Sequence, residues 1–408
     1  MDNKLSLGFV HGIVPAFFLA VSVGQIYAFT NFATDIAEYI GSSQGSVQFA
    51  FSLGIFFLGM GAAFFGKIVE KNIKLSTCIG TVLFIAGMLT CCMGIRCKSL
   101  PLIYLGYGFL GGLGTGIIYI SPVKTMMMWF TKHKALGASL PIIFFGLGST
   151  FSTFIYSKLI RHGIENIFLY FALIYVIMMA IGAILLKKPI SEAELAKQQA
   201  QATPGAQEGF SYGKLLKDHF FIHSWLFMFL NISSGLCLIP LAKQMMNSEG
   251  IGYSAAMITT IVSLCGIMNG GGRFVFAFWS DKLKRRINII CIILAVSLAT
   301  MSVTLALPVA IGAALLIINA CYGAGFSVIP AIISDKFGMG NISKIHGAVL
   351  SAWGVAGLVG NQLSMLVSTK LGYGSTGVLL MLVILYALNL VNFFFMKRLA
   401  LANTLAIN

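Results

Sequence analysis

Long apolar stretches alternate with short polar ones along the whole chain. A helix needs about 20 apolar residues to cross the hydrocarbon core of a bilayer, and stretches of this length recur from end to end. The first is too long for the apolar part of a signal peptide and has no small-residue cleavage site, so we predict it to be a span. The pattern predicts an all-α polytopic membrane protein with twelve transmembrane helices, at residues 9–33, 43–66, 74–94, 100–129, 135–161, 164–186, 219–246, 254–279, 286–307, 309–335, 344–371 and 374–397.

One polar segment divides these spans into six and six. It reads "KKPISEAELAKQQAQATPGAQEGFSYGKLLKDH" and covers residues 187–219. We predict an N-terminal six-helix bundle at 1–186, a cytoplasmic linker at 187–218 and a C-terminal six-helix bundle at 219–408. A short charged loop follows the second span of each half, at 66–74 and 280–286. Paired halves are typical of internally repeated transporters, whose substrate site lies near the bilayer midplane.

Composition and charge agree with a membrane location. The chain has 408 residues, of which 58% are hydrophobic and 10% charged, whereas soluble domains are about 25% charged. A net charge of +15 could indicate a nucleic-acid partner. However, most of the 27 Lys and Arg residues lie in segments on one side of the predicted spans. The positive-inside rule places that side, with both termini, in the cytoplasm of a plasma or inner membrane, and we expect no nucleic-acid partner.

The sequence offers little for catalysis or metal binding. The eight cysteines form no CxxC pair, so we expect them to pack as small side chains without a structural disulfide. The chain contains no HExxH motif. We therefore expect neither an enzyme nor a bound metal or cofactor.

The stretch "NGGGRFVFAFWSDKLKRR" (269–286) places an arginine deep inside a span. Arg273 precedes Asp281 by eight residues, or about 12 Å of helix, which is close to the middle of the bilayer. A guanidinium there costs at least ~2.5–3.5 kcal/mol. An ion pair between two helices could explain it, but all 12 acidic residues lie in loops or at span ends. We therefore predict that Arg273 binds a mobile carboxylate, with an amide contribution from Asn269 on the same helix face.

Other polar groups inside spans have two interpretations each. Lys124 in "YISPVKTMMMWF" either extends to the cytoplasmic interface or supplies a second cation to a cavity. The mid-span phenols of Tyr27, Tyr119 and Tyr322 either belong to the core or bind a substrate carboxylate. His346, like the other histidines, lies near a loop or span end and is not expected to be a site residue.

These pieces together resemble the major facilitator superfamily, and within it the oxalate/formate antiporter branch, which includes lactate and pyruvate carriers. The resemblance covers most of the chain. Its most specific part is the arginine-bearing eighth span followed by "SDK". It implies rocker-switch alternating access, with Arg273 binding the substrate carboxylate. The matching segments are "GQIYAF" with Tyr27, "GTGIIY" with Tyr119, "WF" at 129–130, "SGLCLIPLAK" at 234–243, "NGGGRFVFAFWSDK" with Asn269 and "FGMGN" at 337–341.

Two positions depart from that branch. The oxalate exchanger has a lysine in its eleventh span that supplies a second positive charge, and the position aligned with it here is Trp353. Lys124 stands where the branch leads us to expect a small polar residue. The first departure argues against oxalate, and the second could restore the missing charge from the other half.

The leading hypothesis is a secondary carrier of small monocarboxylates such as lactate, pyruvate or formate. We expect a monomer embedded in the lipid bilayer, and the candidate substrate contacts are Arg273, Asn269, Tyr27, Tyr119, Tyr322, Trp353 and Lys124. An oxalate/formate-type antiporter of dicarboxylate against monocarboxylate is the alternative, and a transporter-like sensor is a more distant one. Proton symport, antiport and uniport stay open.

Overall fold

The computed structural model describes residues 7–189, 211–247, 251–283 and 285–405, and these are almost entirely helical. Within those ranges, twelve helices have the length and apolar composition needed to cross a membrane. Each predicted span overlaps one of the twelve. The predicted all-α fold of a polytopic membrane protein is therefore confirmed.

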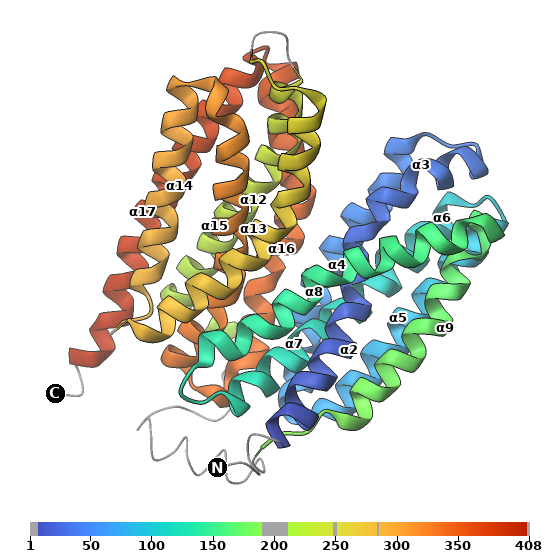
Figure 1. Cartoon of the computed structure of the whole chain (residues 1–408). Helices are drawn as coiled ribbons and strands as arrows, with labels where there is room; N and C mark the ends of the chain where they lie inside the picture. Colours follow the sequence, from blue (N-terminus) through green and yellow to red (C-terminus); the bar gives the residue numbers. More distant parts are fainter. Residues whose placement is uncertain (1–6, 190–210, 248–250, 284, 406–408) are drawn as a thin grey trace. The chain divides into compact units, whose positions relative to one another are not determined.

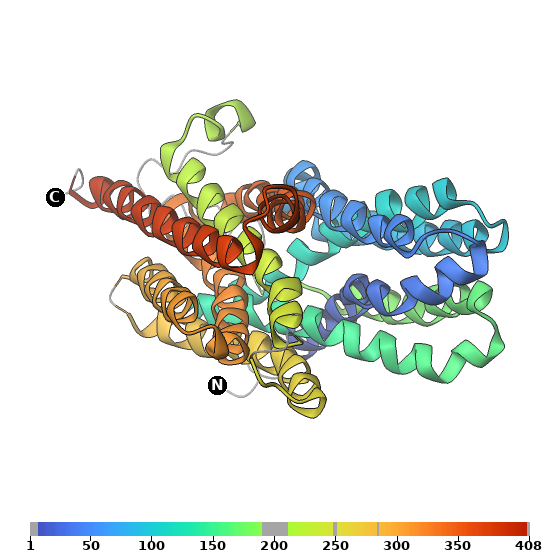
Figure 2. The same ribbon diagram turned by 90° about the horizontal axis from the view of Figure 1, so that it is seen from above.

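The chain forms two compact units, each a bundle of long helices (Figures 1 and 2). Unit 1 contains residues 1–209 and 333–354, and unit 2 contains residues 210–332 and 355–408. The helix α16 (Ile342–Met365) thus contributes its first turns to unit 1 and the others to unit 2. The predicted boundary between two six-helix bundles stays a prediction, since most of the linker, 190–210, lies outside the described residues.

Unit 1 contains the first six spans. The first is continuous but changes type, from η1 (Phe9–Ile13) through α2 (Val14–Val23) and the 3-10 segment η2 (Gly24–Ala28) to α3 (Phe29–Ile40). The others are α4 (Gln44–Lys71), α5 (Ile73–Arg96), α6 (Leu100–Ile103) continued by η3 (Tyr104–Gly111) and α7 (Gly112–Trp129), α8 (Lys134–Leu159) continued by η4 (Ile160–His162), and α9 (Ile164–Leu185).

Within unit 1, α2 packs against α7, α8 and α9, while α5 packs against both α7 and α9. Helix α4 packs along α7. The core between these helices is rich in phenylalanine and tyrosine. Phe29 stacks on Tyr107 with 4.1 Å between ring centroids, and the Tyr107 hydroxyl donates to the backbone oxygen of Ile26 at 2.8 Å. Such a paired phenol satisfies its polar atom inside an apolar bundle.

Unit 2 contains most of the later spans. Helix α12 packs against α17, which also packs against α14. The described elements are α11 (Tyr212–Leu215), α12 (His219–Met246), α13 (Ala255–Lys282), α14 (Asn288–Ala306), η5 (Pro308–Ala310), α15 (Ile311–Phe337), the last turns of α16, η7 (Leu366–Lys370) and α17 (Gly374–Leu405). The short η6 (Met339–Asn341) precedes α16 in unit 1.

Two predicted boundaries need correction. The first span extends to Ile40 rather than 33, because α3 continues as an amphipathic helix that buries Phe32 and Ile36 and exposes Glu38. The charged segment 66–74 is helical up to Lys71, and only Asn72 separates α4 from α5. The Asn72 side chain accepts a hydrogen bond from the backbone N–H of Leu75 at 3.0 Å and so caps α5.

Candidate functional site

Four aromatic side chains meet in the interior of unit 1, and we call them the aromatic box: Tyr27, Tyr119, Phe145 and Trp353. Ring centroids of Tyr27 and Trp353 are 6.2 Å apart, and those of Tyr119 and Trp353 are 5.6 Å apart. Phe145 contacts all three others, at 5.2–5.9 Å. The structure thus brings together three of the predicted site residues, which come from the first, fourth and eleventh spans.

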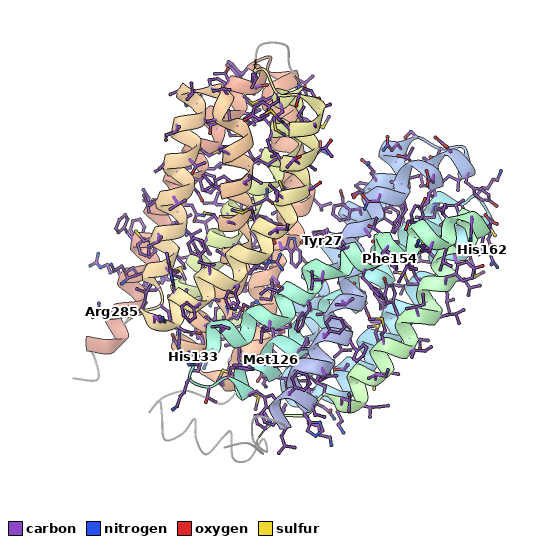
Figure 3. The ribbon with its side chains drawn as sticks, in the orientation of Figure 1. Tyr27, Met126, His133, Phe154, His162 and Arg285 are labelled. Atoms are coloured by element: carbon purple, nitrogen blue, oxygen red, sulfur yellow. The ribbon has the colours of Figure 1, made fainter. Side chains whose placement is uncertain are left out.

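Close backbone contact between η2 and α8 positions Tyr27 in the box. A Cβ atom added at Gly24 would lie 1.9 Å from the backbone oxygen of Phe145, so only glycine permits this contact. A Cβ at Gly148, one turn along α8, would lie 2.6 Å from Cα of Gly24. Tyr27 therefore lies beside Phe145, well away from His162 at the end of η4 (Figure 3).

His346 adjoins the aromatic box, although its sequence position suggested a span end. Its ring centroid lies 6.4 Å from that of Tyr119, and the side chain is 1% exposed. The adjacent Gly347 lets α16 press directly on α4, since a Cβ there would lie 2.1 Å from the backbone oxygen of Ala62. One sequence signal could have identified His346: it precedes Trp353 by seven residues, which places both on one face of a helix.

Lys124 forms an ion pair within unit 1. Its ammonium contacts the carboxylate of Glu70, and the Lys124 side chain is 2% exposed. The second carboxylate oxygen of Glu70 accepts from the backbone N–H of Ser343, at the start of α16, at 2.8 Å. The sequence predicts Glu70 in a loop or at a span end, and the structure places it in the last turns of α4. Lys124 therefore has a carboxylate partner in this structure, which neither sequence interpretation anticipated.

In unit 2, Arg273 is almost fully buried on α13, with 3% of the side chain exposed. Its guanidinium carbon lies 5.8 Å from the centroid of the Phe326 ring on α15. The nearest acid along α13, Asp281, accepts a hydrogen bond from Arg286 at 3.1 Å. The structure therefore agrees with the predicted burial of Arg273 within a span.

The glycines that precede Arg273 have different roles. A Cβ at Gly272 would lie 2.2 Å from the backbone oxygen of Ala320, so this glycine allows α13 and α15 to touch. On α15, a Cβ at Gly323 would lie 2.3 Å from the backbone oxygen of Asn269 and 3.1 Å from Cγ of Arg273. Gly271 and its preceding neighbour face open space within the described part of the chain.

We call four residues the arginine cluster: Arg273, Phe326, Asn269 and Tyr322. The Asn269 side-chain amide donates to the backbone oxygen of Asn319 at 3.3 Å, so it joins α13 to α15. Tyr322 and Phe326 contact edge to face at 5.4 Å, and Tyr322 is 7% exposed. The structure thus gathers the three predicted residues of the second half on one pair of helices.

Sequence reasoning missed Asn231 on α12. Its side chain is fully buried, and neither polar atom of its amide has a hydrogen-bond partner among the described residues. A Cβ at Gly325 on α15 would lie 2.7 Å from its Nδ2 atom. A buried amide normally finds a partner, so Asn231 is a candidate polar group that no motif had marked.

The described residues offer few groups suited to metal binding. Across residues 7–189, 211–247, 251–283 and 285–405, no three His, Cys, Asp or Glu side chains gather closely enough to hold a metal ion. All eight cysteines are free thiols. The polar chemistry of the described chain therefore rests on the arginine, the phenols, the imidazole and the buried amides.

Comparison with known proteins identifies related sequences. Residues 14–361 match the sequence model of the Major Facilitator Superfamily. The oxalate:formate antiporter of Oxalobacter formigenes is 27% identical over 368 residues, which cover 89% of this chain and 85% of that protein. The uncharacterized MFS-type transporter YhjX of Escherichia coli (strain K12) is 27% identical over 355 residues, or 83% of each chain. Monocarboxylate transporter 12 of Xenopus laevis is 27% identical over 281 residues, covering 62% of this chain and 59% of that protein.

These relatives confirm the resemblance to the oxalate/formate branch that the motifs indicated. Among solved structures, a bacterial homologue of the iron transporter ferroportin in the outward-facing state matches with a TM-score of 0.72. The match covers 95% of this chain and 98% of that one at 13% identity. At so low an identity the likeness establishes the fold alone.

Proposed function

Because the chain belongs to the major facilitator superfamily, we propose that it carries small monocarboxylate anions across a membrane by alternating access. The observation that carries this proposal is the burial of Arg273, 3% exposed, within a span. A guanidinium at such a depth is costly and matches a carboxylate in a two-point fork. In this proposal Arg273 binds the carboxylate, and the neighbouring Tyr322 and Asn269 shape its surroundings. The named relatives are transporters rather than enzymes, and so we propose transport rather than catalysis.

The aromatic box supports a short apolar substrate. Tyr27, Tyr119, Phe145 and Trp353 offer ring faces and edges rather than charges, which suit a methyl or short alkyl end. We propose that the box selects for the non-carboxylate end of the anion. The prediction that one substrate contacts residues of both halves stays a prediction.

Charge balance favours one carboxylate over two. An unpaired buried charge costs several kcal/mol, so a dicarboxylate needs about one cation for each carboxylate. Arg273 supplies one. Lys124 is neutralised by Glu70, and Trp353 occupies the position where the resemblance implies a second cation. We therefore expect monocarboxylates to bind better than oxalate.

The alternative is exchange of a dicarboxylate against a monocarboxylate. It is favoured by the 27% identity to the oxalate:formate antiporter over most of both chains. It requires a second cation, and Lys124 could serve only if its pair with Glu70 opened.

A competition assay distinguishes the two proposals. Purified protein in liposomes is given labelled lactate or pyruvate, with unlabelled C1 to C4 acids as competitors. We expect formate, lactate and pyruvate to inhibit uptake at lower concentrations than oxalate does. Stronger inhibition by oxalate in the wild type, lost in Lys124→Asn, would favour the dicarboxylate carrier and make Lys124 a site cation. Binding without measurable flux would favour a sensor.

We also propose that both termini lie in the cytoplasm, because the basic residues gather on that side of the spans. Cys97, exposed between α5 and α6, would then face outward. Labelling of Cys97 by a membrane-impermeant maleimide added outside intact cells tests this orientation, and protection of Cys97 would contradict it.

A further inference from the structure

His346 is a titratable group buried in unit 1 that the proposed function leaves without a role. It lies on α16, two turns before Trp353, and its side chain is 1% exposed. Its ring lies 6.4 Å from Tyr119 of the aromatic box. The Nε2 atom has no hydrogen-bond partner within the described part of the chain. A buried polar atom normally has one, so this nitrogen is available for a proton or a ligand.

The polar and charged groups along this part of the fold belong to α16 itself, to α7 and to α4. On α7 these are the phenol of Tyr119 and, five residues further along, Lys124. On α4 they are Glu70 and Lys67, which both act electrostatically on Lys344 of α16 itself. Tyr27 of η2 and Phe145 of α8 belong to the same aromatic box as Tyr119.

Of these groups, Glu70 is the one acid, and both oxygens of its carboxylate already have partners. One oxygen contacts Lys124, and the other accepts from the backbone N–H of Ser343. Protonation of Glu70 would remove the negative charge that balances the buried ammonium of Lys124, which is strongly unfavourable. The Nε2 atom of His346 has no hydrogen-bond partner among the described residues. Imidazole is also the side chain whose charge ordinarily changes between pH 5 and 8.

We propose that His346 binds the proton that accompanies the transported monocarboxylate, which makes the carrier a proton symporter. This inference rests on the proposed function. One proton adds to the ring nitrogen on the side where the anion binds, and the same N–H bond breaks on the side where the anion leaves. Nothing is oxidised, and no other bond changes.

Electrostatic linkage couples the two events. An imidazolium beside the aromatic box is a buried cation, which is unfavourable without a negative charge nearby. An anion whose apolar end rests against the box brings that charge into a low-dielectric interior, where it acts over several ångströms. The anion therefore favours the proton, and by reciprocity the proton favours the anion. Affinity for the monocarboxylate should rise as the pH falls.

The test uses the full-length protein in liposomes and separates two kinds of transport. A pH gradient, alkaline inside, drives net accumulation of labelled lactate in a symporter. Counterflow, with lactate on both sides at one pH, requires no net proton movement. The variants are His346→Gln and His346→Asn, which keep a polar side chain of similar size. The control is His162→Gln, at an exposed histidine at the end of η4 (Figure 3).

We expect gradient-driven accumulation to fall by about 10-fold or more in the His346 variants, a typical size for coupling between two ligands. Counterflow should persist in them, and its pH dependence should flatten. His162→Gln should accumulate lactate as the wild type does. In the wild type, a pH dye should register proton entry when lactate is added.

Each contrary result is informative. Gradient-driven accumulation retained by a His346 variant overturns the proposal. So does a wild type that carries lactate with no proton movement, an outcome that leaves the proposed carrier function standing. A wild type that moves no carboxylate by either assay overturns both. Because the dye measurement is made on the wild type, proton symport itself is tested even if both variants fail to fold.

Discussion

At the scale of single residues, selectivity depends on which side chains are cations. Trp353 fills a position where the resemblance implies a lysine, and it contacts Tyr27, Tyr119 and Phe145. The cationic side chain that the resemblance places there would balance the second carboxylate of oxalate. The difference between a monocarboxylate and a dicarboxylate carrier would then reduce largely to one side chain.

We predict that Trp353→Lys improves recognition of oxalate. The half-inhibiting concentration of oxalate against labelled lactate should fall by about tenfold, since a buried charge gains a partner. The matched control is Trp279→Lys, at a half-exposed tryptophan near the end of α13. An unchanged oxalate constant in Trp353→Lys, in a variant that still carries lactate, would contradict the role given to this position.

At the scale of elements, α13 and α15 hold the arginine cluster together by direct backbone contact. Gly272 is the glycine that this contact requires, whereas Gly271 faces open space among the described residues. Small residues at such contacts let transmembrane helices approach closely. The depth and direction of Arg273 follow from that approach.

We predict that Gly272→Ala separates α13 from α15 and impairs transport. The added Cβ would lie 2.2 Å from a backbone oxygen, and overpacking of this kind costs about 1–3 kcal/mol. The melting temperature in detergent and the uptake of lactate should both fall. Gly271→Ala is the control and should match the wild type in both. If the two variants behave alike, the close contact does not position the arginine.

Hydrophobic patterning was sufficient to predict the helices and their number of crossings. The spans could be located because each must satisfy its backbone internally in an apolar medium, which leaves a continuous apolar run. Helix ends were less predictable. Residues 66–71 include the charged Lys67, Glu70 and Lys71, yet they are helical because α4 continues past the apolar run.

The candidate site was partly predictable, for a physical reason. A charged residue within an apolar span is recognisable in the sequence, and so Arg273 could be identified as a candidate site residue from the sequence alone. Contacts between distant segments could not be. Glu70 and Lys124 are 54 residues apart, and only the packing of α4 on α7 brings them together. The sequence shows only that His346 lies near the end of a span. Its burial against Tyr119 depends on tertiary packing and could not be predicted.

At the scale of the whole molecule, the proposed carrier combines a buried arginine, an aromatic box and a separate titratable imidazole. A fixed cation selects anions, the box favours an apolar end, and the imidazole links uptake to pH. Of these three statements, the first supports the other two, because without anion recognition there is no substrate to select or to couple.

The most direct measurement is therefore uptake of labelled lactate and pyruvate by liposomes containing Arg273→Lys. Lysine keeps the charge but loses the planar two-point fork, so we predict uptake ~100-fold below the wild type with normal expression and melting temperature. Arg161→Lys, at an exposed arginine in η4, should transport as the wild type does. Near-normal uptake by Arg273→Lys would contradict the two-point carboxylate site, and with it the central claim.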